Sequence, residues 1–349
     1  MNIIVEDTLG LPPFSMNHAS FEMRIGMFTN LERIVMLSND NDNIFLEVNS
    51  ALVDIIKEKY SEFNINSKDF HDGLKLKGSV PYKKLSDNLN DVSEWGQILK
   101  LNEEFLFHDF EIYSSSQDYN KHKSAILVNS ESIKINTKSN LKAGVIIDAS
   151  DGPVVIGKNV IIDVGAIIKG PVFIDNYSYI APGAKIRSGT SIGKNCKIGG
   201  EVSCSVILDY SNKAHDGFLG HSFVGEWVNI GAGTNNSNLK NNYSKVKFDY
   251  GDSRGVVITN EQFLGAFIGD YSKIGISTML NTGTHIGIGS NVFGAGFQKK
   301  YILPFSWGHS DKVDFNKFLE TCKRMKDRRN VVMSKVEIEF LEKIYDKIN

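Results

Sequence analysis

The 349-residue sequence has no excess of either charge, no long apolar runs and few cysteines. It holds 39 basic and 41 acidic residues, which gives a formal net charge of −2 with both signs mixed along the chain. A protein that binds nucleic acid through a broad basic face needs far more positive charge. We therefore exclude that class and expect no nucleic-acid partner.

No apolar run in the sequence approaches the ~20 residues that a membrane-spanning helix requires. The first ten residues, MNIIVEDTLG, lack the basic start and apolar core of a secretory signal peptide. The three cysteines, Cys196, Cys204 and Cys322, are scattered and suit neither a disulfide framework nor a zinc site. We expect a cytoplasmic protein without a metal site and without contact with a membrane.

What the sequence does contain is an isoleucine at every sixth position over a long stretch. The eight positions of this ladder are Ile156, Ile162, Ile168, Ile174, Ile180, Ile186, Ile192 and Ile198. A second aliphatic ladder follows at Ile268, Ile274, Leu280, Ile286 and Val292. A period of six fits neither a helix nor a plain strand. It is typical of a β-solenoid in which three short strands form each triangular coil and one aliphatic side chain per strand points inward.

The part of the chain before the solenoid, residues 1–125, is predicted to form a mixed α/β lobe. Residues 1–7, MNIIVED, have the pattern of a strand. Apolar residues at helical spacing predict helices over 45–60 and 95–107. The polar, aperiodic segment 114–122 is interpreted as a linker to the solenoid.

The solenoid domain is predicted over residues 126–308, with its regular coils between about 133 and 297. Residues 309–349 are predicted to form a helical tail, because helical spacing returns over 313–328 and 334–348. We expect this tail to cap the open end of the solenoid; a role in binding a ligand or a neighbouring subunit is the alternative.

The six-residue rhythm is interrupted between the two ladders. Val224 and Ile230 lie two residues out of the first phase, and a polar segment over 234–255 follows them. Regular coils need no such segment, and loops on a rigid scaffold commonly carry function. We therefore expect the functional residues to lie near the interruption.

The segment over 213–234, KAHDGFLGHSFVGEWVNIGAGT, resembles the acetyltransferase half of the bacterial bifunctional N-acetylglucosamine-1-phosphate uridyltransferase/glucosamine-1-phosphate acetyltransferases. A variant branch of that family also has motifs similar to NIGAGTNNSNLKNNY, FLGAFIGDYSKIGISTMLNTGTHIG and PFSWG. The resemblance implies a left-handed parallel β-helix that forms a homotrimer. It also implies transfer of an acetyl group from acetyl-CoA to an amino-sugar phosphate, in sugar-nucleotide or cell-envelope polysaccharide biosynthesis.

The N-terminal segment LPPFSMNHASFEMRIGMFT is similar to the degenerate nucleotidyltransferase start of that branch, with Asn17-His18-Ala19 where Thr-Arg-Pro is usual. This similarity implies a second activity that would use UTP or another nucleoside triphosphate with Mg²⁺. Arg24 is the candidate contact for the nucleotide phosphates. The glycine-rich basic loop that cradles a triphosphate is missing after the first strand, which favours one activity over two.

The resemblance assigns roles to individual residues of the solenoid. His215 aligns with the catalytic histidine and would be the base that takes the amine proton. Arg187 aligns with the arginine that contacts the sugar phosphate, and a guanidinium can hold a phosphate through two hydrogen bonds. Glu201, Asn229 and Lys245 align with residues near the sugar.

Ala232 and Asn238 match positions that line the coenzyme A groove of the family. Two departures leave the acceptor open, since Phe218 replaces a substrate-contacting tyrosine and Ser203 replaces a phosphate-site lysine. A different amino sugar or a sugar nucleotide remains an alternative.

Each candidate also has a structural explanation, as a corner, ladder or solvent-exposed residue of the solenoid. Three functions therefore stay open: an acetyltransferase alone, a bifunctional enzyme, and a non-catalytic scaffold that binds a sugar nucleotide. The position of His215 within the motif KAHDGFLG favours catalysis over the scaffold.

Overall fold

The computed structural model describes residues 1–8, 10–67, 72–87, 89–113 and 120–348. Most of the predicted linker over 114–122 lies outside these residues. The chain divides into two compact units, and each is described by itself. The larger unit holds residues 25–27 and 95–312, and the smaller unit holds 1–24, 28–94 and 313–349.

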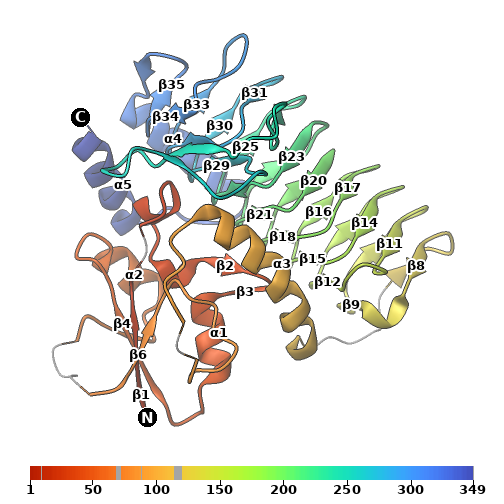
Figure 1. The fold of residues 1–349 in the computed structure, drawn as a ribbon, viewed down its shortest axis with the longest axis horizontal. Helices are drawn as coiled ribbons and strands as arrows, with labels where there is room; N and C mark the ends of the chain where they lie inside the picture. The colour runs from red at the N-terminus through yellow and green to blue at the C-terminus, as the bar shows by residue number, and fades with distance from the viewer. Residues whose placement is uncertain (9, 68–71, 88, 114–119, 349) are drawn as a thin grey trace. The chain divides into compact units, whose positions relative to one another are not determined.

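The larger unit is a parallel β-helix with three faces (Figure 1). The first face consists of β7 (Asn120–Lys121), β10 (Asn140–Leu141), β13 (Ile161–Ile162), β16 (Tyr179–Ile180), β19 (Lys197–Ile198), β22 (Asn212–Lys213), β25 (Asn229–Ile230), β30 (Lys273–Ile274), β33 (Asn291–Val292), β35 (Ser306–Trp307) and the antiparallel β36 (Asp311–Lys312). The second face consists of β8 (Ile126–Val128), β11 (Ile146–Asp148), β14 (Ile167–Lys169), β17 (Lys185–Ile186), β20 (Glu201–Ser203) and β23 (Phe218–Gly220). The predicted parallel solenoid is therefore confirmed.

The third face completes each triangular coil. It consists of β9 (Ile133–Ile135), β12 (Val154–Ile156), β15 (Val172–Ile174), β18 (Thr190–Ile192), β21 (Val206–Ile207), β24 (Phe223–Val224), β29 (Ala266–Ile268), β32 (Thr284–Ile286) and β34 (Tyr301–Ile302). The coils extend beyond the predicted range of 133–297 at both ends. The first coil escaped prediction because Lys121 stands in its strand in register with Leu141, in place of a ladder aliphatic.

The isoleucine ladders form the core of the β-helix. Ile162 pairs with Ile180 and Ile180 with Ile198 in the register of adjacent coils, and all three side chains are fully buried. Burial of each such side chain contributes about 1.5–3 kcal/mol to stability. The next coil is shorter, so Ile198 pairs with Lys213, only fifteen residues later. The following coil, in which Ile207 pairs with Val224, is also short, by one residue. The two short coils together produce the two-residue shift in the six-residue rhythm.

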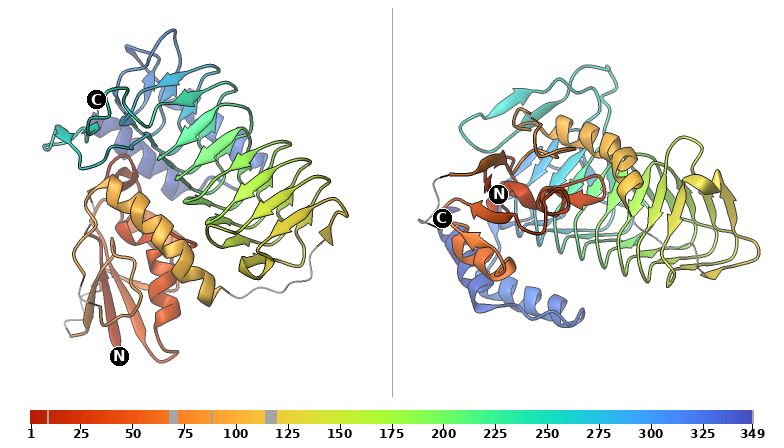
Figure 2. Two further views of the ribbon diagram at one scale, coloured as in Figure 1. Left: turned by 45° about the vertical axis from the view of Figure 1, so that its right-hand side comes forward. Right: turned by 90° about the horizontal axis from the view of Figure 1, so that it is seen from below.

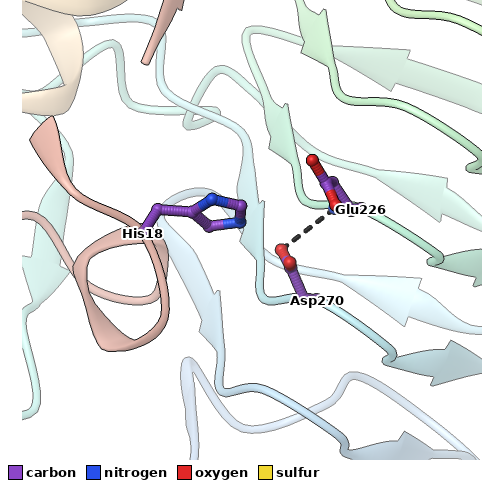
Figure 3. A group of neighbouring side chains, drawn as sticks. All are labelled: His18, Glu226 and Asp270. Atoms are coloured by element: carbon purple, nitrogen blue, oxygen red, sulfur yellow. Dashed lines mark hydrogen bonds between the residues drawn. The ribbon is translucent and has the colours of Figure 1, made fainter. Parts of the chain in front are cut away.

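The corners between the third and first faces are capped by side-chain oxygens from the following coil. The backbone amide of Lys194 donates to Asp209 Oδ1 at 2.8 Å, and that of Glu226 donates to Asp270 Oδ1 at 2.9 Å (Figure 3). Asn195 beside the first cap adopts φ of 57°, a left-handed conformation that asparagine tolerates. The corners are thus hydrogen-bonded from coil to coil.

Helix α3 (Trp95–Ile112) packs against the third face, as both views in Figure 2 show. The Trp95 ring lies 4.7 Å from the rings of Phe223 and Phe267. Asn102 is buried and donates to the carbonyl of Gly189 at 2.9 Å. The helix predicted over 95–107 is confirmed, and its apolar contacts make it part of the β-helix unit.

The polar segment predicted at the interruption begins in β26 (Asn235–Asn236) and continues into an antiparallel hairpin. The hairpin consists of β27 (Lys247–Asp249) and β28 (Val256–Ile258). The ring of Phe248 on β27 packs edge-on against Phe267 at 5.1 Å. The segment is therefore a packed element with its own strands.

The smaller unit contains a parallel sheet in the order β5–β4–β1–β6. Its elements are β1 (Asn2–Glu6), β4 (Asn43–Glu47), β5 (Asn64–Ile65), β6 (Leu74–Lys77), α1 (Asn30–Leu37), α2 (Val53–Lys59), α4 (Phe315–Asp327) and α5 (Lys335–Ile348). The strand predicted at the N-terminus is confirmed. The helix predicted over 45–60 is wrong in its first part, because Phe45 and Leu46 pair with the central strand β1 and only α2 is helical.

Helices α4 and α5 confirm the helical character predicted for the tail. The Ser334 hydroxyl before α5 donates to a carboxylate oxygen of Glu58 on α2 at 2.6 Å, and Phe340 and Leu341 of α5 are buried. The tail thus folds with the α/β unit, and α3 folds with the β-helix. This division differs from the predicted boundaries of 1–125, 126–308 and 309–349. Within the described residues, no helix has both the length and the apolar character to cross a membrane.

Candidate functional site

His215 lies on the corner between β22 on the first face and β23 on the second, and its side chain is exposed. The corners of neighbouring coils stack closely around it. The amide of Gly233 in the coil above donates to the carbonyl of Asp216 at 2.9 Å. In the coil below, a Cβ on Gly200 would lie 2.9 Å from the carbonyl oxygen of His215. Glycine at these corners lets the backbones approach while the imidazole stays accessible.

A buried lysine lies directly behind this corner. Lys213 is 3% exposed, and its Nζ donates to the carbonyls of Gly199 at 2.9 Å and His215 at 2.8 Å. Burial lowers the pKa of Lys213 to about 8, against the smaller opposing influence of Asp216. We did not predict a role for Lys213. The sequence signal is a lysine where the ladder would place an aliphatic residue, but the shortened coil hides that register.

The second face carries three of the residues singled out from the sequence. Arg187 Nη1 lies 2.8 Å from Glu201 Oε1, so the structure brings these two candidates together. Glu201 pairs in register with Phe218, whose strand begins three residues after His215. Both members of the ion pair are partly exposed, and such pairs contribute less than about 1 kcal/mol. The guanidinium can therefore exchange this partner for another anion at little cost.

The second face changes its hydrogen bonding immediately after β23. The backbone amides of Phe218 and Gly220 donate to the side-chain oxygens of Asn235 and Asn236, both at 2.8 Å. Asn236 Nδ2 also donates to the carbonyl of Gly220 at 3.0 Å. Side-chain amides thus stand in for the backbone of the next strand, and β26 pairs instead with β31 (Met279–Leu280). Sequence reasoning missed this bridge, whose signal is the Asn-Asn pair after the motif NIGAGT.

Asn238 lies beside His221, at the end of β23 opposite to His215. Its Nδ2 is 2.8 Å from His221 Nδ1, and the amide must be the donor, so the imidazole proton resides on Nε2. Burial lowers the pKa of His221, which keeps the ring neutral. The ring stacks on Phe263 with centroids 5.1 Å apart. Asn238 is therefore fixed by a neutral histidine.

The remaining predicted residues lie at three places in the fold. Asn229 is exposed on the first face, in register with Lys273. Ala232 lies on the corner of the coil above His215, where its carbonyl accepts from the amide of Ser277 at 2.7 Å. Lys245 lies in the loop before β27, where Nζ donates to Asn260 Oδ1 at 3.0 Å. The first two adjoin the His215 corner through neighbouring coils, whereas Lys245 belongs to the inserted segment.

In the smaller unit, Arg24 at the start of β2 (Arg24–Ile25) is 4% exposed, so a nucleotide phosphate cannot reach it without local rearrangement. The loop after β1 is held by its own hydrogen bonds. Asp7 Oδ1 accepts from the amide of Ser20 at 2.8 Å, and the Thr8 hydroxyl donates to Ser79, which donates to Asp91. Carboxylates and hydroxyls therefore line this strand end, and the basic Lys77 beside it is paired with Asp91, with 3.2 Å between Nζ and Oδ2. A triphosphate requires basic groups that are free to bind it.

Three relatives show what the chain is similar to. A bifunctional sugar-1-phosphate nucleotidylyltransferase/acetyltransferase of Sulfurisphaera tokodaii is 31% identical over 144 residues, which cover 41% of this chain and 35% of that protein. The bifunctional protein GlmU of Thermodesulfovibrio yellowstonii is 31% identical over 160 residues, covering 41% and 32%. That of Thermotoga maritima is 34% identical over 139 residues, covering 39% and 27%. The chain resembles the bifunctional nucleotidyltransferase/acetyltransferases.

This finding confirms the resemblance inferred from the motifs. The chain spans about a third of the length of the curated relatives that it matches. No family model matches it. Among solved structures, a Francisella novicida UDP-N-acetylglucosamine acyltransferase is 14% identical, covers 65% of this chain and 87% of that one, and has a TM-score of 0.39.

Proposed function

We propose that the chain is an acetyl-CoA-dependent N-acetyltransferase that acts on an amino-sugar phosphate or a related sugar. The observation that carries the proposal is the exposed His215 on a stacked glycine corner, next to a face that presents Arg187 and Glu201. The names of the relatives, which join an acetyltransferase to a sugar-1-phosphate nucleotidylyltransferase, support the same chemistry. The reaction would belong to sugar-nucleotide or cell-envelope polysaccharide biosynthesis in the cytoplasm.

The proposed step is attack of the sugar amine on the thioester carbonyl carbon. His215 accepts the proton that the nitrogen loses as the new C–N bond forms. The tetrahedral adduct then breaks its C–S bond, and the departing coenzyme A thiolate takes up that proton. Arg187 would release Glu201 to hold the sugar phosphate, and Asn229 and Glu201 would contact the sugar.

The two departures from the family motif bear on the acceptor. Phe218 lies in the strand that follows His215 and offers no hydroxyl, and Ser203 is buried and offers no positive charge. Without the tyrosine hydroxyl and the lysine ammonium, this site offers fewer hydrogen-bond donors to the sugar. A sugar whose polar groups would stay unpaired in the site binds less well, so the preferred sugar changes. We therefore propose an acceptor that need not be glucosamine 1-phosphate.

We also propose that the β-helix assembles as a homotrimer with acetyl-CoA between neighbouring subunits. Exposed aliphatic side chains on the early coils support a subunit contact, since Ile126, Val164 and Ile167 are 53%, 47% and 40% exposed. Ala232 and Asn238 would then border the coenzyme groove.

A second candidate activity is nucleotidyl transfer with UTP or another nucleoside triphosphate and Mg²⁺. The parallel sheet of the smaller unit and the names of the relatives favour it. The acidic end of β1 and the buried Arg24 weigh against it. A non-catalytic scaffold is the third candidate, and measured turnover with acetyl-CoA would exclude it.

The test is a thiol-release assay with acetyl-CoA and a panel of amino sugars, their 1-phosphates and nucleotide-linked amino sugars. We expect turnover with one acceptor class and a loss of about 100-fold or more in His215→Ala. The matched control is His122→Ala, another exposed histidine of the β-helix, which should keep its activity. Equal rates for His215→Ala and the parent would remove His215 as the base. No turnover with any acceptor would favour the scaffold.

A further inference from the structure

Among the described coils, the first face holds the charged side chain of Lys213 at a buried, inward position. Ile162, Ile180 and Ile198 occupy this column in the earlier coils, and Lys213 follows them in register. Its side chain is 3% exposed. A position that is aliphatic in the coils below thus holds an amine.

The ammonium connects two consecutive corners of the β-helix. It donates to the carbonyl of Gly199 in the coil below, at 2.9 Å, and to the carbonyl of His215 in its own coil, at 2.8 Å. A Cβ on Gly200 would lie only 2.8 Å from Nζ and 2.7 Å from the carbonyl oxygen of Gly217. The lysine therefore fills the space that glycine leaves at the corner, directly behind the exposed histidine.

Stability alone does not explain a lysine at this place. An aliphatic side chain would continue the ladder, whereas a buried ammonium loses its hydration and recovers only part of that loss through two carbonyls. The depressed pKa of Lys213 is the sign of this cost. What the amine provides, and an aliphatic side chain cannot, is the pair of hydrogen bonds that fix the His215 peptide.

We propose that Lys213 is a positioning residue that holds the His215 corner from inside the β-helix. Its hydrogen bond keeps the carbonyl of His215 turned inward, and the imidazole on the same residue then points outward from a fixed backbone. The inference rests on the proposed role of His215 as the base. A displacement of about 1 Å in a catalytic group lowers rates by as much as about 100-fold, so a clamp of this kind has a measurable effect.

The test uses Lys213→Met in the full chain, with Lys197→Met as control. Methionine keeps the length and apolar stem but cannot donate, and Lys197 is an exposed lysine on the preceding strand of the same face. For Lys213→Met we expect an unchanged or higher Tm, a kcat lowered about 10- to 100-fold, and a KM for acetyl-CoA within about twofold of the parent. The control should match the parent in all three.

A second readout does not depend on turnover. The amides of Glu201 and Gly233 donate to the carbonyls of Gly217 and Asp216 on either side of the corner. We expect both amides to exchange hydrogen at least tenfold faster in Lys213→Met, while the amide of Gly183, on an earlier corner, stays unchanged. Lys213→Gln, which retains an N–H donor, should recover part of the protection and of kcat, and it replaces the Met variant if that variant does not fold.

The outcomes separate the two proposals. Parental kcat and parental exchange in both variants would overturn the role of Lys213 even if the enzyme acetylates sugars. A lower Tm with unchanged kcat would reduce Lys213 to a structural residue and also overturn it. If the parent shows no turnover, the proposed function fails, and faster exchange in the variants would still support the clamp.

Discussion

At the scale of single residues, the β-helix buries an ionisable side chain other than Lys213 on its third face. His285 on β32 is 1% exposed, and its Nδ1–H donates to the carbonyl of Asp249 at 2.8 Å. The ring stacks on Phe248 at 5.5 Å and lies 4.9 Å from Tyr301. Within the described part of the chain, its buried Nε2 has no hydrogen-bond partner. Burial lowers the pKa of His285 to about 4, although Asp249 and Asp252 oppose the shift.

This depressed pKa predicts a loss of stability in acid. The unfolded chain takes up the proton near pH 6.5 and the folded chain only near pH 4, so stability falls as the pH decreases between these values. In His285→Phe this contribution disappears. Between pH 6.5 and 4, the free energy of unfolding in urea should fall less for His285→Phe than for the parent. We expect a difference on the order of 2 kcal/mol. An equal dependence in both would contradict the assignment, and His122→Phe should behave as the parent.

How much of the site could be predicted depends on the residue. The place of His215 on a corner could be expected from its sequence motif, and its role as the base stays a prediction. The inward direction of Lys213 could not be expected, because it depends on a coil that is shorter than the others. The neutral state and the tautomer of His221 also escaped prediction. The first depends on burial of the ring, and the second depends on Asn238, seventeen residues away.

At the scale of elements, the bridge between β23 and β26 is the unusual feature of the β-helix. Asn236 is 4% exposed and satisfies both the amide and the carbonyl of Gly220. In Asn236→Ala the buried amide of Gly220 would lose its partner, and the carbonyl of Gly220 would keep only the hydrogen bond from the Ser222 hydroxyl. We expect a loss of about 1–3 kcal/mol in the free energy of unfolding. Denaturant titration measures this loss.

The neighbouring asparagine is the matched control for that prediction. Asn235 is exposed and bonds only one amide of β23, that of Phe218. Asn235→Ala should cost clearly less, because water can replace the lost bond. If the two variants lost the same free energy of unfolding, the buried hydrogen bonds of Asn236 would contribute no more to stability than the exposed one of Asn235.

The ladder predicted the coils because the inward aliphatic residue of each strand recurs at a fixed spacing in the amino-acid sequence. The same reasoning failed where tertiary contacts decide the structure. The apolar residues before α2 have helical spacing, yet Phe45 and Leu46 pair with β1 and form a strand. The docking of α3 depends on Trp95 meeting Phe223, and no local pattern in the sequence specifies that pairing.

At the scale of the whole molecule, the proposed acetyl transfer uses only side chains and backbone groups of the β-helix. None of its steps requires a metal ion, whereas nucleotidyl transfer would require Mg²⁺. We therefore expect EDTA to leave thiol release from acetyl-CoA within about twofold of the untreated rate. If EDTA abolished thiol release and added Mg²⁺ restored it, acetyl transfer would depend on a metal ion, and this account of the reaction would be contradicted.

The central claim is that His215 catalyses transfer of an acetyl group to the nitrogen of an amino sugar. The most direct measurement is mass spectrometry of the acceptor after incubation with acetyl-CoA labelled with ¹³C in the acetyl group, using the parent, His215→Asn and His122→Asn. The account predicts labelled N-acetyl product from the parent and from His122→Asn, and a rate lower by about 100-fold or more from His215→Asn. Labelled product formed at equal rates by all three proteins would contradict it.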